Sequence, residues 1–310
     1  MRAIQPAPLL WLQAGNTYMA LAPEVGGSIA ALYTADTATD LPQLDPYGAF
    51  HWLRPASVAA LQARDPLGMA SFPLVPWCNR IRDGRTEVQG QQLQLPSRGG
   101  MDHAIHGLGW QDAWEIVGQT RHSATLEYAY PGGAWPWAFT AQQSFTLAAD
   151  GLHCAMSLRN DSLRTMPAAL GHHPYFPHRT GTRLRCAVNS MWESDTDMLP
   201  LRRSQPPFLP ALCLGMALSG LNLDNNFTGW DRQFSIDWPL QRRHLSLTAD
   251  APLDYFVLFC PQGADHFCAE PVSNCTDWLN RPQDAHVGGT SLAAGAELVS
   301  GFHLAWGESG

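Results

Sequence analysis

Five polar residues in this 310-residue sequence lie in local settings that could support acid–base chemistry or ligand binding. They are Arg80, His106, His173, Asp224 and Glu270. Glu270 follows the apolar segment 257–269, which Pro271 ends, so its carboxyl group is expected to be partly buried. Burial would raise the carboxyl pKa above about 4.3 and make Glu270 a usable general base near neutral pH. The alternative is a glutamate at the rim of the fold, paired with an arginine.

His173 lies in the segment GHHPYF and could donate a proton near neutral pH, because imidazole titrates at about 6.5. Pro174 restricts His173 to an extended backbone, in which consecutive side chains point to opposite faces. His172 and His173 should therefore face different surroundings, which argues against a metal site made by both rings. The alternative is a histidine packed against Tyr175 and Phe176.

The other three candidates could bind a ligand, and each also has an ordinary structural explanation. Arg80 and Arg82 share one face of an extended segment and could anchor hydroxyl groups or an anion, or form a solvated rim. His106 precedes GLGW, where glycine lets the backbone approach a ligand closely, or it is a turn residue of no consequence. Asp224 precedes two asparagines and could equally lie in a turn.

The hydrophobic pattern that must position these residues is typical of β-strands. Alternating apolar and polar residues predict strands at 123–130 and 152–161, and a hairpin over 234–250. The continuous apolar segment 254–261 predicts a strand buried on both faces, and 296–306 predicts a further strand.

Helix signals are weak. Segment 56–66 predicts one or two helical turns that end at Pro66, and the proline-rich segment 200–212 predicts a surface loop. Segment 1–15 predicts a first strand rather than a signal peptide. We therefore predict an all-β protein, in which residues 1–310 form one large antiparallel β-sandwich domain with few short helices.

Composition argues against several classes of partner. The net charge is −8 and there is no lysine-rich or arginine-rich run, so no nucleic-acid partner is expected. No stretch of 18 apolar residues occurs, so no membrane span is expected. The seven cysteines are widely spaced and form no CxxC pair, which predicts free thiols in the cytoplasm and no structural zinc site. Dinucleotide-binding, P-loop, zinc-protease and lipase motifs do not occur.

Five short motifs follow one another along the chain: NRI at 79–81, HG at 106–107, HPYF at 173–176, LDNNF at 223–227 and AEPVSN at 269–274. This order resembles the bacterial branch of the aldose 1-epimerase (galactose mutarotase) family, over nearly the whole chain from about residue 20. The last three motifs together are the specific ones. The resemblance implies the galactose mutarotase-like supersandwich fold. It also implies interconversion of the α and β anomers of free aldoses, without metal or organic cofactor. The twelve tryptophans and twelve phenylalanines agree weakly, because aromatic rings stack on sugars.

Carried over motif by motif, the resemblance implies Glu270 as the catalytic base and His173, as an imidazolium, as the catalytic acid. Arg80, His106 and Asp224 would bind the sugar hydroxyls. The family places its active histidine two residues before the tyrosine, which selects His173 and not its neighbour. His172 departs slightly from the family, where asparagine is common at this position.

Three other functions stay open. A hexose-6-phosphate 1-epimerase would need additional arginines that converge on the phosphate. The candidates are Arg82, Arg85, Arg202 and Arg203. A carbohydrate-binding β-sandwich would bind sugar without turnover. A glycoside hydrolase would use Glu270 and Asp224 as its two carboxylates and leave the acid histidine without a role. The expected partner is a monosaccharide, and the protein is expected to be a monomer or a homodimer.

Overall fold

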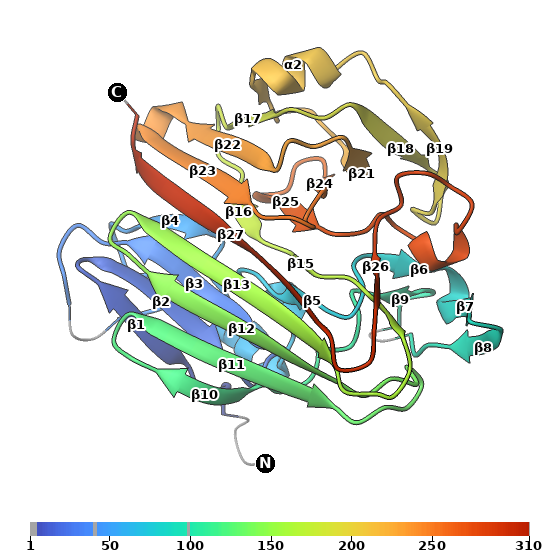
Figure 1. The fold of residues 1–310 in the computed structure, drawn as a ribbon. Coiled ribbons are helices and arrows are strands. Elements are labelled where there is room, and N and C mark those ends of the chain that lie inside the picture. The colour runs from blue at the N-terminus through green and yellow to red at the C-terminus, as the bar shows by residue number, and fades with distance from the viewer. Residues whose placement is uncertain (1–4, 40–41, 98–99, 310) are drawn as a thin grey trace.

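Two large antiparallel sheets dominate the computed structural model, which describes residues 5–39, 42–97 and 100–309 (Figure 1). The first sheet has nine strands, in the spatial order β10 (Glu115–Gln119), β11 (Ser123–Tyr130), β12 (Phe139–Leu147), β13 (Gly151–Asn160), β27 (Glu297–Glu308), β23 (Arg243–Ala249), β22 (Gln233–Trp238), β17 (Arg183–Cys186) and β20 (Met216–Ala217).

The second sheet has eight strands and carries most of the candidate site. Its order is β19 (Pro200–Ser204), β18 (Ser190–Ser194), β21 (Leu223–Thr228), β24 (Tyr255–Cys260), β25 (His266–Val272), β15 (Gly171–His172) and β5 (Pro73–Leu74), with β16 (Tyr175–Pro177) also paired to β25. The predicted all-β sandwich is therefore confirmed.

Smaller elements complete the described fold. A four-stranded sheet contains β1 (Leu10–Ala14), β2 (Thr17–Ala22), β3 (Ser28–Thr34) and β4 (Phe50–Leu53). Three strand pairs are β6 (Arg80–Ile81) with β9 (Ala104–Ile105), β7 (Arg85–Val88) with β8 (Gln91–Gln94), and β14 (Met166–Ala168) with β26 (Thr290–Leu292). The α-helices are α1 (Val58–Ala63) and α2 (Leu209–Leu214), and 3-10 turns cover Pro66–Gly68, Arg82–Gly84, Pro239–Gln241 and Trp278–Asn280.

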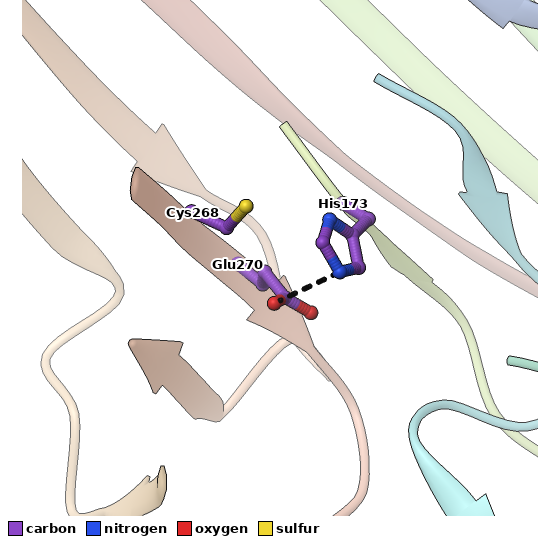
Figure 2. Close-up of side chains that lie close together, drawn as sticks. All are labelled: His173, Cys268 and Glu270. Carbon is purple, nitrogen blue, oxygen red and sulfur yellow. Dashed lines mark ion pairs between the residues drawn. The ribbon is translucent and has the colours of Figure 1, made fainter. Parts of the chain in front are cut away.

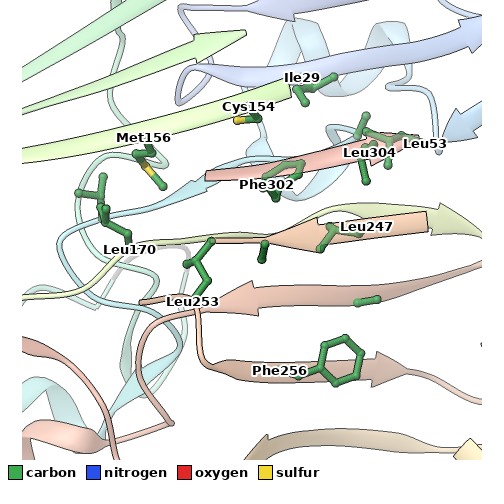
Figure 3. Packing of buried hydrophobic residues seen from close by; sticks show 14 of the residues in the cluster. Ile29, Leu53, Cys154, Met156, Leu170, Leu247, Leu253, Phe256, Phe302 and Leu304 are labelled. Carbon is green, nitrogen blue, oxygen red and sulfur yellow. The ribbon is translucent and has the colours of Figure 1, made fainter. Parts of the chain in front are cut away.

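One buried apolar cluster joins the two large sheets (Figure 3). Strand β24 shows how the sequence builds it. Phe256 and Leu258 belong to this core, whereas Val257 and Phe259 belong to a second cluster on the opposite face of the sheet. The segment is apolar at both parities because both faces of the strand are covered, as its continuous hydrophobicity predicted.

Most predicted elements are confirmed, including the strands at 123–130 and 296–306 and the hairpin that β22 and β23 form. Ser57 caps α1, and its side chain accepts a hydrogen bond from the Ala60 backbone. The predicted surface loop at 200–212 is wrong, because this segment contains β19 and most of α2. Its prolines occupy permitted places: one opens a strand at the sheet edge, and another lies in the first turn of the helix. Within the described ranges, no helix is long and apolar enough to cross a membrane.

Candidate active site

All five candidate residues line one pocket on the face of the eight-stranded sheet opposite the core. The pocket has a volume of about 170 Å³. Its lining residues are Leu67, Asn79, Arg80, Met101, Ile105, His106, His173, Tyr175, Asp224, Phe259 and Glu270. Along β25, Phe267 and Ala269 belong to the core, so the alternating Cys268 and Glu270 point to the pocket side.

Glu270 and His173 form a buried acid–base pair at the pocket floor (Figure 2). The distance from His173 Nε2 to Glu270 Oε1 is 3.4 Å, and the two residues are only 7% and 2% exposed. The His173 ring packs against both Phe72 and Tyr175, with ring centroids 4.6 Å and 4.8 Å away, and these two rings also contact each other. Its backbone N–H donates to the Phe72 carbonyl at 3.0 Å. The ring is therefore held with one nitrogen toward the carboxylate.

Burial moves the pKa values of this pair in opposite directions. The pKa of Glu270 is raised well above its usual value by burial and by the negative charge of Asp224, which Arg80 opposes. The pKa of His173 is lowered to about 3 by burial, and the positive charges of Arg54 and Arg80 add to the effect. The raised pKa of Glu270 agrees with the expectation that burial would raise it. The pKa of His173 therefore lies below the value of about 6.5 from which its role as an acid was predicted, and that role stays a prediction.

Arg80 and Asp224 meet across the pocket, although they are far apart in the sequence. Arg80 Nη2 lies 3.3 Å from Asp224 Oδ2, and its Nη1 donates to Asn79 Oδ1 at 3.1 Å. The Asp277 backbone N–H donates to the Arg80 carbonyl at 2.8 Å. The side chain of Asp277 also takes part, because its Oδ1 accepts a hydrogen bond from the Arg82 backbone N–H at 2.9 Å. These bonds fix the short strand that presents the guanidinium.

His106 completes the pocket beside His173. The two rings meet edge to face with centroids 5.1 Å apart, and burial lowers the pKa of His106 well below its usual value. His106 has a positive φ of 62°, an uncommon conformation outside glycine that clusters at functional sites. Gly107 follows, where a Cβ atom would lie 2.0 Å from the Val75 carbonyl oxygen. Gly107 therefore permits a close approach to the backbone of Val75, which follows strand β5, rather than to a ligand.

His172 faces the opposite side of the sheet, as the extended backbone predicted. Its Nε2 lies 3.4 Å from Cys154 Sγ on β13, and its ring packs edge-on against Phe302 on β27. It therefore belongs to the core between the two large sheets, and burial lowers its pKa to about 3.

The additional arginines do not converge on this pocket. Arg82 lies 3.7 Å from the Asp195 carboxylate, and Arg85 donates to Gln94. Arg202 makes two hydrogen bonds to Glu193, and Arg203 lies over the ring of Trp192. Arg80 is the only arginine among the described residues that line the pocket.

Sequence reasoning missed the residues that hold the acid in place. Phe72 and Arg54 carry no motif that would have marked them. Tyr175 was noted only as a packing neighbour. Arg54 lies 3.9 Å from the centroid of the Tyr175 ring and donates to the carbonyls of Leu67 and Met69. Arg54, Tyr175, His173 and Phe72 thus form one contiguous cluster that only the tertiary structure assembles.

One group in the described ranges could hold a metal ion by proximity. The donor atoms of His173, Cys268 and Glu270 lie within 4.8 Å of one another (Figure 2). Burial raises the pKa of the Cys268 thiol well above its usual value, and Cys268 does not line the pocket. A metal ligand would have to be the thiolate, so the fit of this donor set to a metal is poor.

Comparison with known proteins identifies the family. The sequence profile described as Aldose 1-epimerase matches residues 8–304. The chain belongs to the aldose 1-epimerase family. A relative from Escherichia coli K12, the uncharacterized protein YphB, is 30% identical over 251 residues, covering 75% of this chain and 82% of that protein.

Two solved structures of similar fold match nearly the whole chain. An Escherichia coli K12 protein described as a candidate aldose 1-epimerase matches with a TM-score of 0.85 and 26% identity, covering 97% of this chain and 99% of the other. A Caenorhabditis elegans homologue of GalM and aldose epimerases has a TM-score of 0.79 and 16% identity, covering 98% and 99%. The galactose mutarotase-like fold implied by the motif order is therefore confirmed.

Proposed function

We propose that this protein is an aldose 1-epimerase that interconverts the α and β anomers of free aldoses. The observation that carries the proposal is the 3.4 Å contact between His173 and Glu270 on the floor of a pocket lined by Arg80, His106 and Asp224. An acid and a base this close can act on the two neighbouring oxygens of an anomeric centre.

The reaction needs one proton donor and one acceptor. Glu270, as the carboxylate, removes the proton from the anomeric hydroxyl, and His173, as the imidazolium, protonates the ring oxygen. The bond between C1 and the ring oxygen breaks and leaves the free aldehyde. After rotation about the C1–C2 bond, the ring closes on the other face of the carbonyl, and the two protons return to their first positions.

The opposite pKa shifts have a consistent place in this scheme. In this scheme the pair holds one proton, and the directions of both pKa shifts favour its position on Glu270, where both groups are neutral. Ring opening returns the pair to this neutral form, since Glu270 has then gained a proton and His173 has lost one. A raised pKa of the base and a lowered pKa of the acid both favour that step. The opposing cost is the free energy of forming the charged pair when sugar binds.

The free sugar, rather than its phosphate, is the substrate we propose. The arginines that a phosphate would require are engaged outside the pocket, and Arg80 is already bound to Asp224.

We further propose a cytoplasmic location, where reducing conditions would keep the seven cysteines as the free thiols seen in the structure.

Polarimetry of freshly dissolved α-D-galactose and α-D-glucose at pH 7 tests the activity and its base together. We expect the wild type to speed the approach to equilibrium and Glu270→Gln to do so far less. If neither sugar responds while the folded wild type still binds it, the protein is a sugar-binding sandwich without turnover. Release of sugar from a glycoside would instead support a hydrolase.

A further inference from the structure

Two residues of the AEPVSN motif, Ser273 and Asn274, have no part in the proposed chemistry, yet both are buried. Ser273 binds the chain just before the two histidines. Its backbone N–H donates to the Leu170 carbonyl at 2.9 Å, and its Oγ accepts from the Leu170 backbone N–H at 2.7 Å. The segment that presents Glu270 is thereby bound to the segment that presents His173.

Asn274 makes the corresponding contact to the segment that presents Arg80. Its Oδ1 accepts from the Cys78 backbone N–H at 3.0 Å. Its Nδ2 donates to the carbonyls of Cys78 at 3.1 Å and Cys275 at 2.8 Å. One carboxamide therefore pairs with both backbone polar groups of Cys78, as a residue of a neighbouring antiparallel strand would. Arg80 follows Cys78 by two residues.

The three segments meet at Gly171, where they pack too closely for any larger side chain. A Cβ atom on Gly171 would lie 2.7 Å from Cys78 Sγ and 3.0 Å from the Pro271 carbonyl oxygen. Glycine therefore lets the segments that carry the acid, the base and the arginine lie directly against one another. The bonds of Ser273 and Asn274 fix their relative positions at this point.

We propose that Asn274 is a positioning residue that sets the place of Arg80 relative to the acid and the base. This inference rests on the proposed epimerase activity, in which Arg80 binds sugar hydroxyls. Without the carboxamide, the backbone N–H and carbonyl of Cys78 lose their partner on this side, so the short strand β6 shifts. The backbone bond from Asp277 to the Arg80 carbonyl still holds the strand, so the effect is a misplaced guanidinium rather than a lost one.

Asn160 provides a matched control, because it is also a fully buried asparagine that binds backbone groups through its carboxamide. Its Nδ2 donates to the carbonyls of Arg164, Leu292 and Ala293, and its Oδ1 accepts from the Ser162 backbone N–H. None of these partners is among the described residues that line the catalytic pocket. Loss of either carboxamide should lower stability, so only a difference in kinetics reports positioning.

The test measures KM and kcat for the better of D-galactose and D-glucose in wild type, Asn274→Ala and Asn160→Ala. We expect Asn274→Ala to raise KM by about three- to tenfold, as misplacing one hydrogen-bond donor would, and to change kcat less. Asn160→Ala should leave both constants unchanged, although thermal unfolding should show that it too is destabilised. If Asn274→Ala does not fold, Asn274→Asp replaces it, because it keeps the volume and the Oδ1 acceptor and loses the Nδ2 donor.

A double-mutant cycle shows whether Asn274 acts through Arg80. In an Arg80→Ala background, Asn274→Ala should lower kcat/KM little further, because the group that it positions is absent. A loss as large as in the wild-type background would overturn the inference, since the two effects would then be independent.

The failures can be distinguished. If the wild type accelerates mutarotation and the KM of Asn274→Ala equals that of wild type or of Asn160→Ala, the positioning role is wrong and the proposed function still holds. No acceleration of either sugar by the wild type would remove the epimerase function and this inference with it.

Discussion

His172 and His173 are neighbours in sequence but belong to opposite faces of the eight-stranded sheet. Both rings are buried, and burial lowers the pKa of each to about 3. His172 packs against Cys154 and Phe302 in the core. His173 has a carboxylate 3.4 Å away and lines a pocket. Equal burial therefore makes one histidine a structural residue and the other a candidate acid, and the difference is the partner on its face.

Removing either member of the pair should have the largest effect. We expect Glu270→Gln and His173→Gln each to lower kcat by about 10²- to 10⁴-fold, because each removes one general acid–base group. Polarimetry measures the rates, and thermal unfolding checks the fold. His172→Gln is the matched control and should keep most of the activity. If it loses as much as His173→Gln, the two faces do not differ as described.

The pH profile of kcat/KM should be broader than an unperturbed glutamate–histidine pair would give. The pair is competent while it holds one proton. Falling pH adds a second proton only near the lowered pKa of His173, about 3, and rising pH removes the one proton only above the raised pKa of Glu270. With unperturbed groups, the pair would hold one proton only between about pH 4.3 and 6.5. We expect kcat/KM at pH 7.5 to keep a larger fraction of its value at pH 5.5 than unperturbed groups would allow.

Asp224→Asn sharpens this test. It removes a negative charge that raises the pKa of Glu270, so the alkaline limit should move to lower pH. An unchanged limit would mean that Asp224 does not act on Glu270 through its charge.

His172 should instead appear in acid stability. Its pKa is about 3 in the folded protein and about 6.5 when unfolded, so the folded state binds its proton more weakly. The stability that it contributes is present above pH 6.5 and is lost as pH falls toward 3. Between pH 6.5 and 5 the loss amounts to about 2 kcal/mol. Urea unfolding should show a shallower pH slope for His172→Gln than for wild type, and identical slopes would contradict this account.

The smallest effect is expected at Arg54, in the cluster of side chains that holds His173. Arg54→Met removes a positive charge that lowers the pKa of His173 and a cation held over Tyr175. We expect the acid to weaken and kcat to fall by roughly two- to tenfold. Arg54→Lys keeps the charge and should lose less. Equal losses would assign Arg54 a purely structural role through its carbonyl contacts.

Local patterns predicted most of the fold. Segment 123–130 alternates between buried and partly exposed side chains, and segment 254–261 is apolar at both parities, so each strand was readable from its own residues. Segment 200–212 was not readable in this way. Proline is tolerated at the start of an edge strand and in the first turn of a helix, so a high proline content does not by itself distinguish these elements from a loop. Its apparent loop composition hid a strand and a helix.

The sequence by itself determined which residues could do the chemistry, because residue types and the order of the motifs are read directly along the chain. It also determined that His172 and His173 face apart, since an extended backbone alternates. Only the tertiary structure decided that Arg80 meets Asp224, 144 residues away, and that Glu270 meets His173. It also decided the direction in which the pKa of each of these two groups is shifted. The pKa of a group depends on solvent exclusion and on charges brought together by folding, and neither is written in the neighbouring residues.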